Sequence, residues 1–200
     1  MKHSIRSIVL AGALGACLVP GSASALSLVG GPVGPGTVTF DFSTPEMVAV
    51  DIAFTAPGTI SLTYELDAAD MTRGSVGFNS IIDNLSGEAF AWLQIYAGAP
   101  GLFFPGSAAS NDGGVALTHF GPAGVRLDFT PAMTTQAYLG DPLFTGAALD
   151  WTLSLAGLAA GDRVVLAVTA AVPEPATWSM SAAGLALIAA LARRRQRAVA

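Results

Sequence analysis

Polar and apolar residues alternate with a period of two in a series of short segments between residues 37 and 170. The clearest segments are 37–42, 48–54, 59–66, 125–129 and 151–155, and further candidates are 76–82, 89–96, 115–120 and 164–170. Successive side chains of a strand point to opposite faces, so a strand with one buried face shows this alternation. Clusters of Gly, Pro, Asn and Asp separate the segments and predict turns.

The number and spacing of these segments predict the fold class. We expect about eight to ten short strands in an all-β, antiparallel β-sandwich or jelly-roll-like domain, without a convincing helix. In the first segment the pattern places Val38, Phe40 and Phe42 on one face of a strand. An N-terminal signal helix and a C-terminal transmembrane helix are expected outside this domain.

The predicted domain, residues 26–171, is large enough for one buried core. Only three of the nine basic residues lie in it, against thirteen of the fourteen acidic residues, so its formal net charge is −10. Such a charge disfavours nucleic acid and anionic lipid as partners, and it is compatible with neutral glycans or divalent cations. The domain has no cysteine and one histidine, His119, which excludes disulfides and zinc sites built from Cys and His.

The first 25 residues are typical of a secretory signal peptide. A basic start precedes an apolar stretch, 8–19, and Ala23 and Ala25 fit the small-x-small rule for cleavage. We therefore predict cleavage after Ala25. In the alternative, Cys17 ends a lipobox-like sequence and becomes a lipidated mature N-terminus.

Residues 172–200 contain three features in order. A tripeptide comes first, an uncharged run from Trp178 to Ala192 comes next, and an arginine cluster comes last. The tripeptide is Pro173, Glu174 and Pro175, and the basic stop is Arg193, Arg194, Arg195 and Arg197. Proline keeps the tripeptide out of a helix. The run is rich in Ala and Leu, which favour helix.

The uncharged run is a candidate membrane anchor. At about 1.5 Å per residue it reaches roughly 22 Å, which is short for a bilayer core of about 30 Å. The side chains expected to contact lipid are Trp178, Leu185, Leu187, Ile188 and Leu191. The arginines favour the cytoplasmic side, so we expect the preceding domain to lie outside the inner membrane.

This tail resembles the sorting signal of PEP-CTERM proteins. In that family, a Pro-Glu-Pro motif, a transmembrane helix and an Arg-rich end form the signal that a membrane enzyme called exosortase recognises and processes. The resemblance implies exosortase as a partner, a transient stay in the inner membrane, and export to the surface of a Gram-negative cell that makes extracellular polysaccharide. The alternative is an ordinary C-terminal anchor with two chance prolines. The resemblance does not fix the activity of the exported domain.

Aromatic residues supply the candidate ligand-binding positions. In segment 89–96, the alternation places Phe90, Trp92, Gln94 and Tyr96 on one face. If exposed, this face can stack on sugar rings, and otherwise the aromatics belong to the core. Phe103 and Phe104 are adjacent, so a strand would direct them to opposite faces, whereas a loop would let both fold inward. The candidate ligand-binding residues are thus Trp92, Tyr96, Phe103 and Phe104.

Neither a metal site nor a catalytic site can be assigned from the sequence. Loop carboxylates can bind calcium, and the candidates in this chain are Asp67, Asp70, Asp83, Asp112 and Asp141. These residues lack the dense Asp-x-Asp-x-Asp-Gly spacing of a calcium loop. In the alternative, they are solvated residues of turns. A glycosidase needs two positioned carboxylates, and the sequence does not nominate a pair. His119 is expected at a buried or edge position with a structural role.

These observations leave three functional hypotheses. The first is a non-enzymatic structural or adhesive protein of the cell surface or extracellular matrix, linked to exopolysaccharide or biofilm and requiring no cofactor. The second is a carbohydrate-binding module that recognises exopolysaccharide through aromatic residues. The third is a polysaccharide hydrolase.

Overall fold

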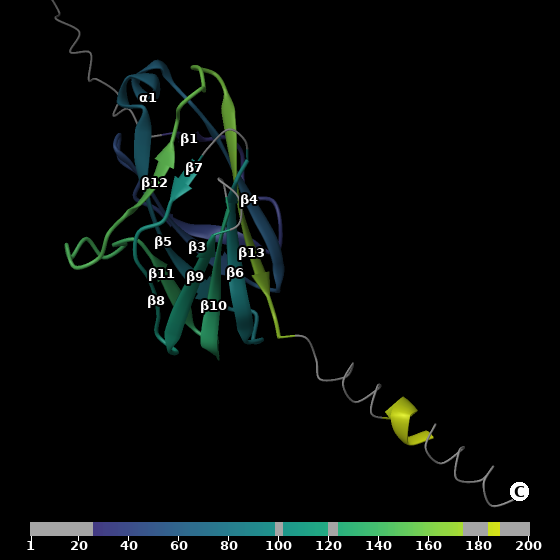
Figure 1. Ribbon diagram of the computed structural model, residues 1–200. Helices are drawn as coiled ribbons and strands as arrows, with labels where there is room; N and C mark the ends of the chain where they lie inside the picture. The colour runs from purple at the N-terminus through teal and green to yellow at the C-terminus, as the bar shows by residue number, and fades with distance from the viewer. Residues whose placement is uncertain (1–25, 99–101, 120–123, 174–183, 189–200) are drawn as a thin grey trace, which may run out of the picture.

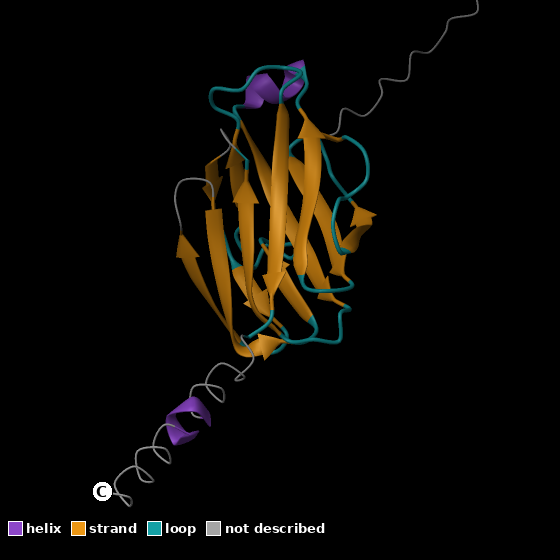
Figure 2. Ribbon diagram, turned by 90° about the vertical axis from the view of Figure 1, so that its right-hand side faces the viewer, coloured by secondary structure: helices purple, strands orange, loops and turns teal. Residues whose placement is uncertain are grey.

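The computed structural model describes residues 26–98, 102–119, 124–173 and 184–188. Two β-sheets face each other across a common core (Figures 1 and 2). The six-stranded sheet has the order β1 (Ser27–Leu28), β4 (Gly58–Glu65), β13 (Arg163–Ala171), β6 (Phe90–Ala97), β10 (Gly124–Met133) and β9 (Gly114–His119). The seven-stranded sheet has the order β2 (Gly36–Asp41), β3 (Met47–Phe54), β5 (Ser75–Asn84), β11 (Gln136–Leu139) and β8 (Ala108–Ser110). In addition, β12 (Trp151–Ser154) pairs with β5, and β7 (Leu102–Phe104) pairs with β12. The all-β prediction is therefore confirmed.

The expectation of purely antiparallel sheets is wrong at one position. All the described strand pairs are antiparallel except β3 and β5, which are parallel. Between these two strands the chain crosses to the six-stranded sheet, where it forms β4, and then returns. Because each crossing reverses the chain direction, β5 runs in the same direction as β3.

Alternate side chains of both sheets meet in one core. The largest fully buried side chains include Trp151, Phe54, Phe90, Ile52, Ile60, Leu62, Leu93 and Ile95. Phe54 of the seven-stranded sheet and Phe90 of the six-stranded sheet meet edge to face, with ring centroids 5.7 Å apart and an interplanar angle of 80°. Full burial of a large apolar side chain contributes about 1.5–3 kcal/mol, so this core stabilises a domain that has no cysteine.

The strand β2 departs from the predicted alternation. Its register with β3 shifts between Val38, which lies opposite Ile52, and Phe40, which lies opposite Asp51. The irregularity places Val38 against the core and turns Phe40 outward, because a bulge inserts a residue and reverses the facing of the residues after it. The predicted common face of Val38, Phe40 and Phe42 is therefore wrong.

One short helix was not expected, α1 (Ala68–Arg73). The Asp67 carboxylate accepts hydrogen bonds from the first-turn amides of Ala69 and Asp70, and the Asp70 carboxylate accepts one from the Asp67 amide. This reciprocal arrangement is a capping box. Gly74 ends the helix in the left-handed conformation.

The two ends of the sandwich differ in what they carry. The helix α1 closes one end, and β13 finishes at Ala171 at the opposite end (Figure 1). Residues 184–188 are helical and exposed. Within the described ranges, no helical segment has the length and hydropathy needed to cross a membrane. The rest of the expected transmembrane helix, the arginine cluster and the signal peptide, with Cys17, Ala23 and Ala25, lie outside the described residues.

Candidate functional site

The sorting tripeptide begins almost directly at the folded domain. Ala171, the last residue of β13, lies opposite Trp92 of β6. Val172 packs against the core, and Pro173 is exposed. Glu174 and Pro175 lie outside the described residues. A processing enzyme that grips this tripeptide therefore works within a residue or two of the packed sheet.

Three residues of β6 share the outer face of the six-stranded sheet. Leu93, Ile95 and Ala97 are fully buried, so the residues between them point away from the core. Trp92 and Gln94 are half-buried, and Tyr96 is 41% exposed. One indole and one phenol ring thus lie on the surface of a single strand, with an amide between them.

Phe90 does not join this face, so the expectation that it shares a face with Trp92 is wrong, whereas the alternative that it belongs to the core is confirmed. It is fully buried and lies opposite Met133 of β10. The pairing of β6 with β10 is irregular between the Trp92–Asp128 pair and the Phe90–Met133 pair. This irregularity breaks the alternation and turns the Phe90 ring into the core, where it contacts Phe54.

Arg126 of β10 completes the surroundings of Trp92. Its guanidinium carbon lies 4.6 Å from the centroid of the indole ring, within cation–π distance. Its Nε and Nη2 atoms donate hydrogen bonds to Oδ1 of Asp128, at 2.8 and 2.7 Å. Because the arginine is held from both sides, it holds the indole in a defined orientation.

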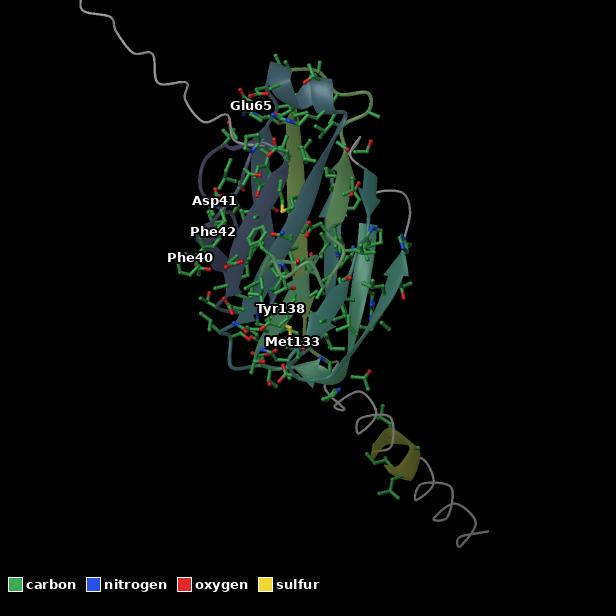
Figure 3. The ribbon with its side chains drawn as sticks, turned by 90° about the vertical axis from the view of Figure 1, so that its left-hand side faces the viewer. Phe40, Asp41, Phe42, Glu65, Met133 and Tyr138 are labelled. Atoms are coloured by element: carbon green, nitrogen blue, oxygen red, sulfur yellow. The ribbon has the colours of Figure 1, made fainter. Side chains whose placement is uncertain are left out.

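All the charged side chains on this outer face are paired among the described residues. Besides Arg126 and Asp128, the face carries Arg163 of β13 and Glu65 of β4, and Arg163 donates from Nε at 3.1 Å and from Nη2 at 3.0 Å to Glu65 Oε2. Glu65 lies near the end of the sandwich that α1 closes (Figure 3). The formal charge of the face is therefore zero, although the domain as a whole is strongly acidic.

Small and hydroxyl-bearing residues fill the rest of the face, together with the exposed Val165 of β13. The cross-strand neighbours of Tyr96 are Ala167 and Gly124, which leave its ring open on both sides. The hydroxyls of Thr59 and Thr169 are 2.8 Å apart and hydrogen-bonded to each other. We call this surface the neutral face; it consists of Trp92, Gln94, Tyr96, Arg126, Asp128, Thr118, Thr59, Thr169, Glu65 and Arg163.

Phe103 and Phe104 are not part of the neutral face. They lie in β7, opposite Leu153 and Thr152 of β12, in the seven-stranded sheet. Their side chains lie outside the described part of the structure. The four candidate ligand-binding residues are thus divided between the two sheets, and of these four only Trp92 and Tyr96 lie on one face.

The aspartates considered for calcium all have partners within the protein. Asp67 and Asp70 cap α1, Asp83 accepts from a glutamine of β11, and Asp112 and Asp141 accept from backbone amides and threonine hydroxyls of neighbouring loops. The hydrogen bonds from backbone amides hold the pKa of Asp112 below its usual value. Across the described ranges, no three Asp, Glu, His or Cys side chains form a group that could hold a metal ion.

Two carboxylates interact on the outer face of the seven-stranded sheet. Burial raises the pKa of Asp51, and the negative charge of Asp83 adds to this, while a hydrogen bond from the Ile81 amide opposes it. Asp83 in turn accepts from Gln136 Nε2 at 2.6 Å. Both carboxylates are thus held by protein donors on the outer face of a sheet. His119 is exposed on the edge strand β9, which agrees with the expected edge position.

The sequence did not predict two exposed apolar clusters. Phe40 and Phe42 are 61% and 56% exposed and stack on each other with ring centroids 5.7 Å apart (Figure 3). In the loop between β11 and β12, Leu143, Phe144 and Leu149 are 62%, 60% and 74% exposed. Both clusters are separate from the neutral face, because they belong to the seven-stranded sheet and its connections.

The loop between β11 and β12 is ordered by its aspartates. The Asp141 carboxylate accepts hydrogen bonds from the Thr145 hydroxyl and the Gly146 amide, and Asp150 accepts from the Asp141 amide. Phe144 has φ +53°, a strained value for a bulky residue. Aspartates within a Gly- and Pro-containing loop were the available sequence signal, but they do not reveal which way the apolar side chains point.

Comparison with known proteins adds one result. The family model of the PEP-CTERM protein-sorting motif matches residues 171–196. No curated protein and no solved structure matches the chain. The sorting motif implies an exported protein whose membrane-anchored precursor is processed by an exosortase on the way to the cell surface. The chain is therefore a PEP-CTERM sorting-domain protein.

Proposed function

We propose that this protein is a non-enzymatic, adhesive or structural component of the cell surface or extracellular matrix, linked to exopolysaccharide and biofilm. The observation that carries the proposal is the position of the sorting motif, one residue after the packed Val172. Among the described residues, the sandwich is the domain that precedes the motif, so export delivers this domain to the surface. Its tightly packed, cysteine-free core is suited to a stable extracellular module.

Outward-facing aromatic residues favour a second candidate function, that of a carbohydrate-binding module. Trp92 and Tyr96 lie on the solvent side of one strand, and Gln94 between them offers both a donor and an acceptor. The Tyr96 ring is open to solvent, whereas one face of the half-buried Trp92 ring already carries the Arg126 guanidinium. This arrangement supports adhesion through polysaccharide.

Sorting is tested with Glu174→Ala in the producing cell. We expect the variant to accumulate as an uncut precursor in the membrane fraction, because the tripeptide loses its charged residue. Glu88→Ala, which removes an exposed acidic side chain from a loop of the domain, is the matched control and should be processed normally. Normal release of the Glu174→Ala variant would contradict the sorting role of the motif.

The non-enzymatic role is tested with the purified protein and the exopolysaccharide of the producing cell. We expect deletion of the protein to weaken cohesion of the matrix, and external addition of the protein to leave the length of the polysaccharide unchanged. Size-exclusion chromatography measures that length. A progressive shortening of the chains would identify a hydrolase and overturn the proposal.

A further inference from the structure

We propose that the neutral face is the binding site of an uncharged polysaccharide chain that runs along β6 from Trp92 to Tyr96. This inference rests on the proposed adhesion to exopolysaccharide, and it adds the site and the chemical class of the ligand. Three observations support the inference: the pairing of charges on the face, the spacing of the two aromatic rings, and the residues that neighbour these rings.

The spacing of the rings indicates an extended ligand. Trp92 and Tyr96 are four residues apart on one strand, which places their Cα atoms about 13 Å apart. This is longer than a single sugar ring, so the two aromatic rings contact different sugars of one chain. Because Ala167 and Gly124 flank Tyr96, no bulky cross-strand neighbour blocks its ring.

The polar groups that lie between the two aromatic rings can form hydrogen bonds with the hydroxyls of a sugar. One face of a pyranose consists of C–H groups that pack on an aromatic ring, and its hydroxyls need both donors and acceptors. Gln94 supplies both from a position between the two aromatics, and the pair of Arg126 and Asp128 lies on the adjacent strand. Arg126 also fixes the Trp92 ring, which reduces the entropy that binding would cost.

The charge distribution selects an uncharged polymer. The arginines of the face are held by Asp128 and Glu65, so an anionic group would have to compete with carboxylates already in place. The domain around the face carries a formal charge of −10, which repels a polyanion at low ionic strength. A polycation would instead be drawn to the acidic surfaces elsewhere on the domain.

The neutral face also differs from the surfaces that suit a protein partner. Protein interfaces are enriched in clustered aromatic and apolar side chains, as in the Phe40–Phe42 stack. On the neutral face, Gln94 separates the two rings, and the hydroxyls of Thr59 and Thr169 lie on neighbouring strands. The stack on the other sheet therefore provides a control surface within the same molecule.

The experiment compares matched polymers with the full chain, purified in a detergent without a sugar headgroup. The probes are hydroxyethyl cellulose, carboxymethyl cellulose, a neutral mannan, a neutral galactan and the exopolysaccharide of the producing cell. Affinity electrophoresis gives the dissociation constants. We expect binding of at least one uncharged polymer, at least tenfold weaker binding in Tyr96→Ala and in Trp92→Ala, and partial recovery in Trp92→Phe.

The control variants are Phe40→Ala and Phe42→Ala, which should bind within about twofold of the unmodified chain. Thermal unfolding checks that each variant is folded. If Trp92→Ala does not fold, the binding measured for Tyr96→Ala tests the inference. Failure to bind any uncharged polymer overturns both the inference and the carbohydrate-binding role, while leaving export intact. Preference for carboxymethyl cellulose, lost in Tyr96→Ala, overturns the ligand class alone. Binding that depends on Phe40 but not on Tyr96 overturns the assigned face.

Discussion

A buried hydroxyl of β4 leads to a prediction that reverses the usual effect of removing a polar group. Tyr64 is 2% exposed, and its hydroxyl has no hydrogen-bond partner among the described residues. The ring borders a cavity of about 10 Å³ whose other lining residues are all apolar. Such a cavity is barely large enough for one water molecule and offers it no polar partners.

The change Tyr64→Phe should therefore stabilise the protein. An unpaired buried polar group costs about 1–3 kcal/mol, and phenylalanine removes that group while keeping the ring. We expect the free energy of unfolding to rise by about 1 kcal/mol or more, with an increase in Tm of about 2–4 °C per kcal/mol for a domain of this size. Urea unfolding followed by tryptophan fluorescence measures the change.

The matched control is Tyr138→Phe on the seven-stranded sheet. The Tyr138 hydroxyl donates to Gln136 Oε1 at 2.8 Å and accepts from Asn111 Nδ2 at 3.0 Å. Its loss should lower the free energy of unfolding by about 0.5–1.5 kcal/mol. If Tyr64→Phe is destabilising to the same extent as Tyr138→Phe, the Tyr64 hydroxyl has a partner and the reasoning is refuted.

The same hydroxyl predicts how stability depends on alkaline pH. Burial raises the pKa of Tyr64 above its usual value of 10.0, and the charge of Asp41 adds to the shift. Folding is unaffected while both states keep the proton. Above about pH 10 only the unfolded state loses it, so stability falls by up to about 1.4 kcal/mol per pH unit. The Tyr64→Phe variant should lack this part of the alkaline loss.

Two further predictions concern loops. Gly106→Ala should lower the free energy of unfolding by about 1–3 kcal/mol, because an added Cβ lies 2.0 Å from the carbonyl oxygen of Leu149, whereas Gly31→Ala, with nothing within 4 Å, should change it by less than about 1 kcal/mol; equal effects in thermal melts would contradict this. Asp112 should stabilise the protein above its usual pKa of 3.8, with the contribution lost as the pH falls below it, since the Thr135 amide and its neighbours lower its folded-state pKa. Acid titration of Asp112→Asn should show a shallower loss over this range, and an unchanged titration would count against the assignment.

Local alternation accounts for much of the fold that could be predicted. Segments 48–54 and 59–66 form β3 and β4, and their apolar positions face the core, because a regular strand fixes the facing of every second residue. Alternation does not predict which way Phe40 and Phe90 face, because each lies beside an irregularity in the pairing of its strand with a partner strand. The helix α1 had a local signal, the Asp67 cap followed by a glycine after its last turn, that was outweighed by the surrounding β pattern.

Part of the candidate site could likewise be predicted from local sequence, and part depends on how the strands pair. Arg126 and Asp128 are two residues apart, so a strand must place them on one face, and that pairing was available from the sequence. Arg163 and Glu65 are separated by 98 positions and meet only because β13 lies beside β4. The neutrality of the face thus depends on topology as well as on local pattern. Composition gives only the net charge of the whole domain and does not reveal where charges are paired.

The place of β13 in the six-stranded sheet determines when this protein can fold. It is the last strand of the sandwich in chain order, yet it lies in the interior of its sheet, between β4 and β6. Until it arrives, both neighbours have an open edge, and the contacts it completes are distant in sequence and therefore slow to form. Completion of the sandwich therefore has to wait until nearly the whole chain is available, and the strand that completes the six-stranded sheet is the one that leads into the sorting motif.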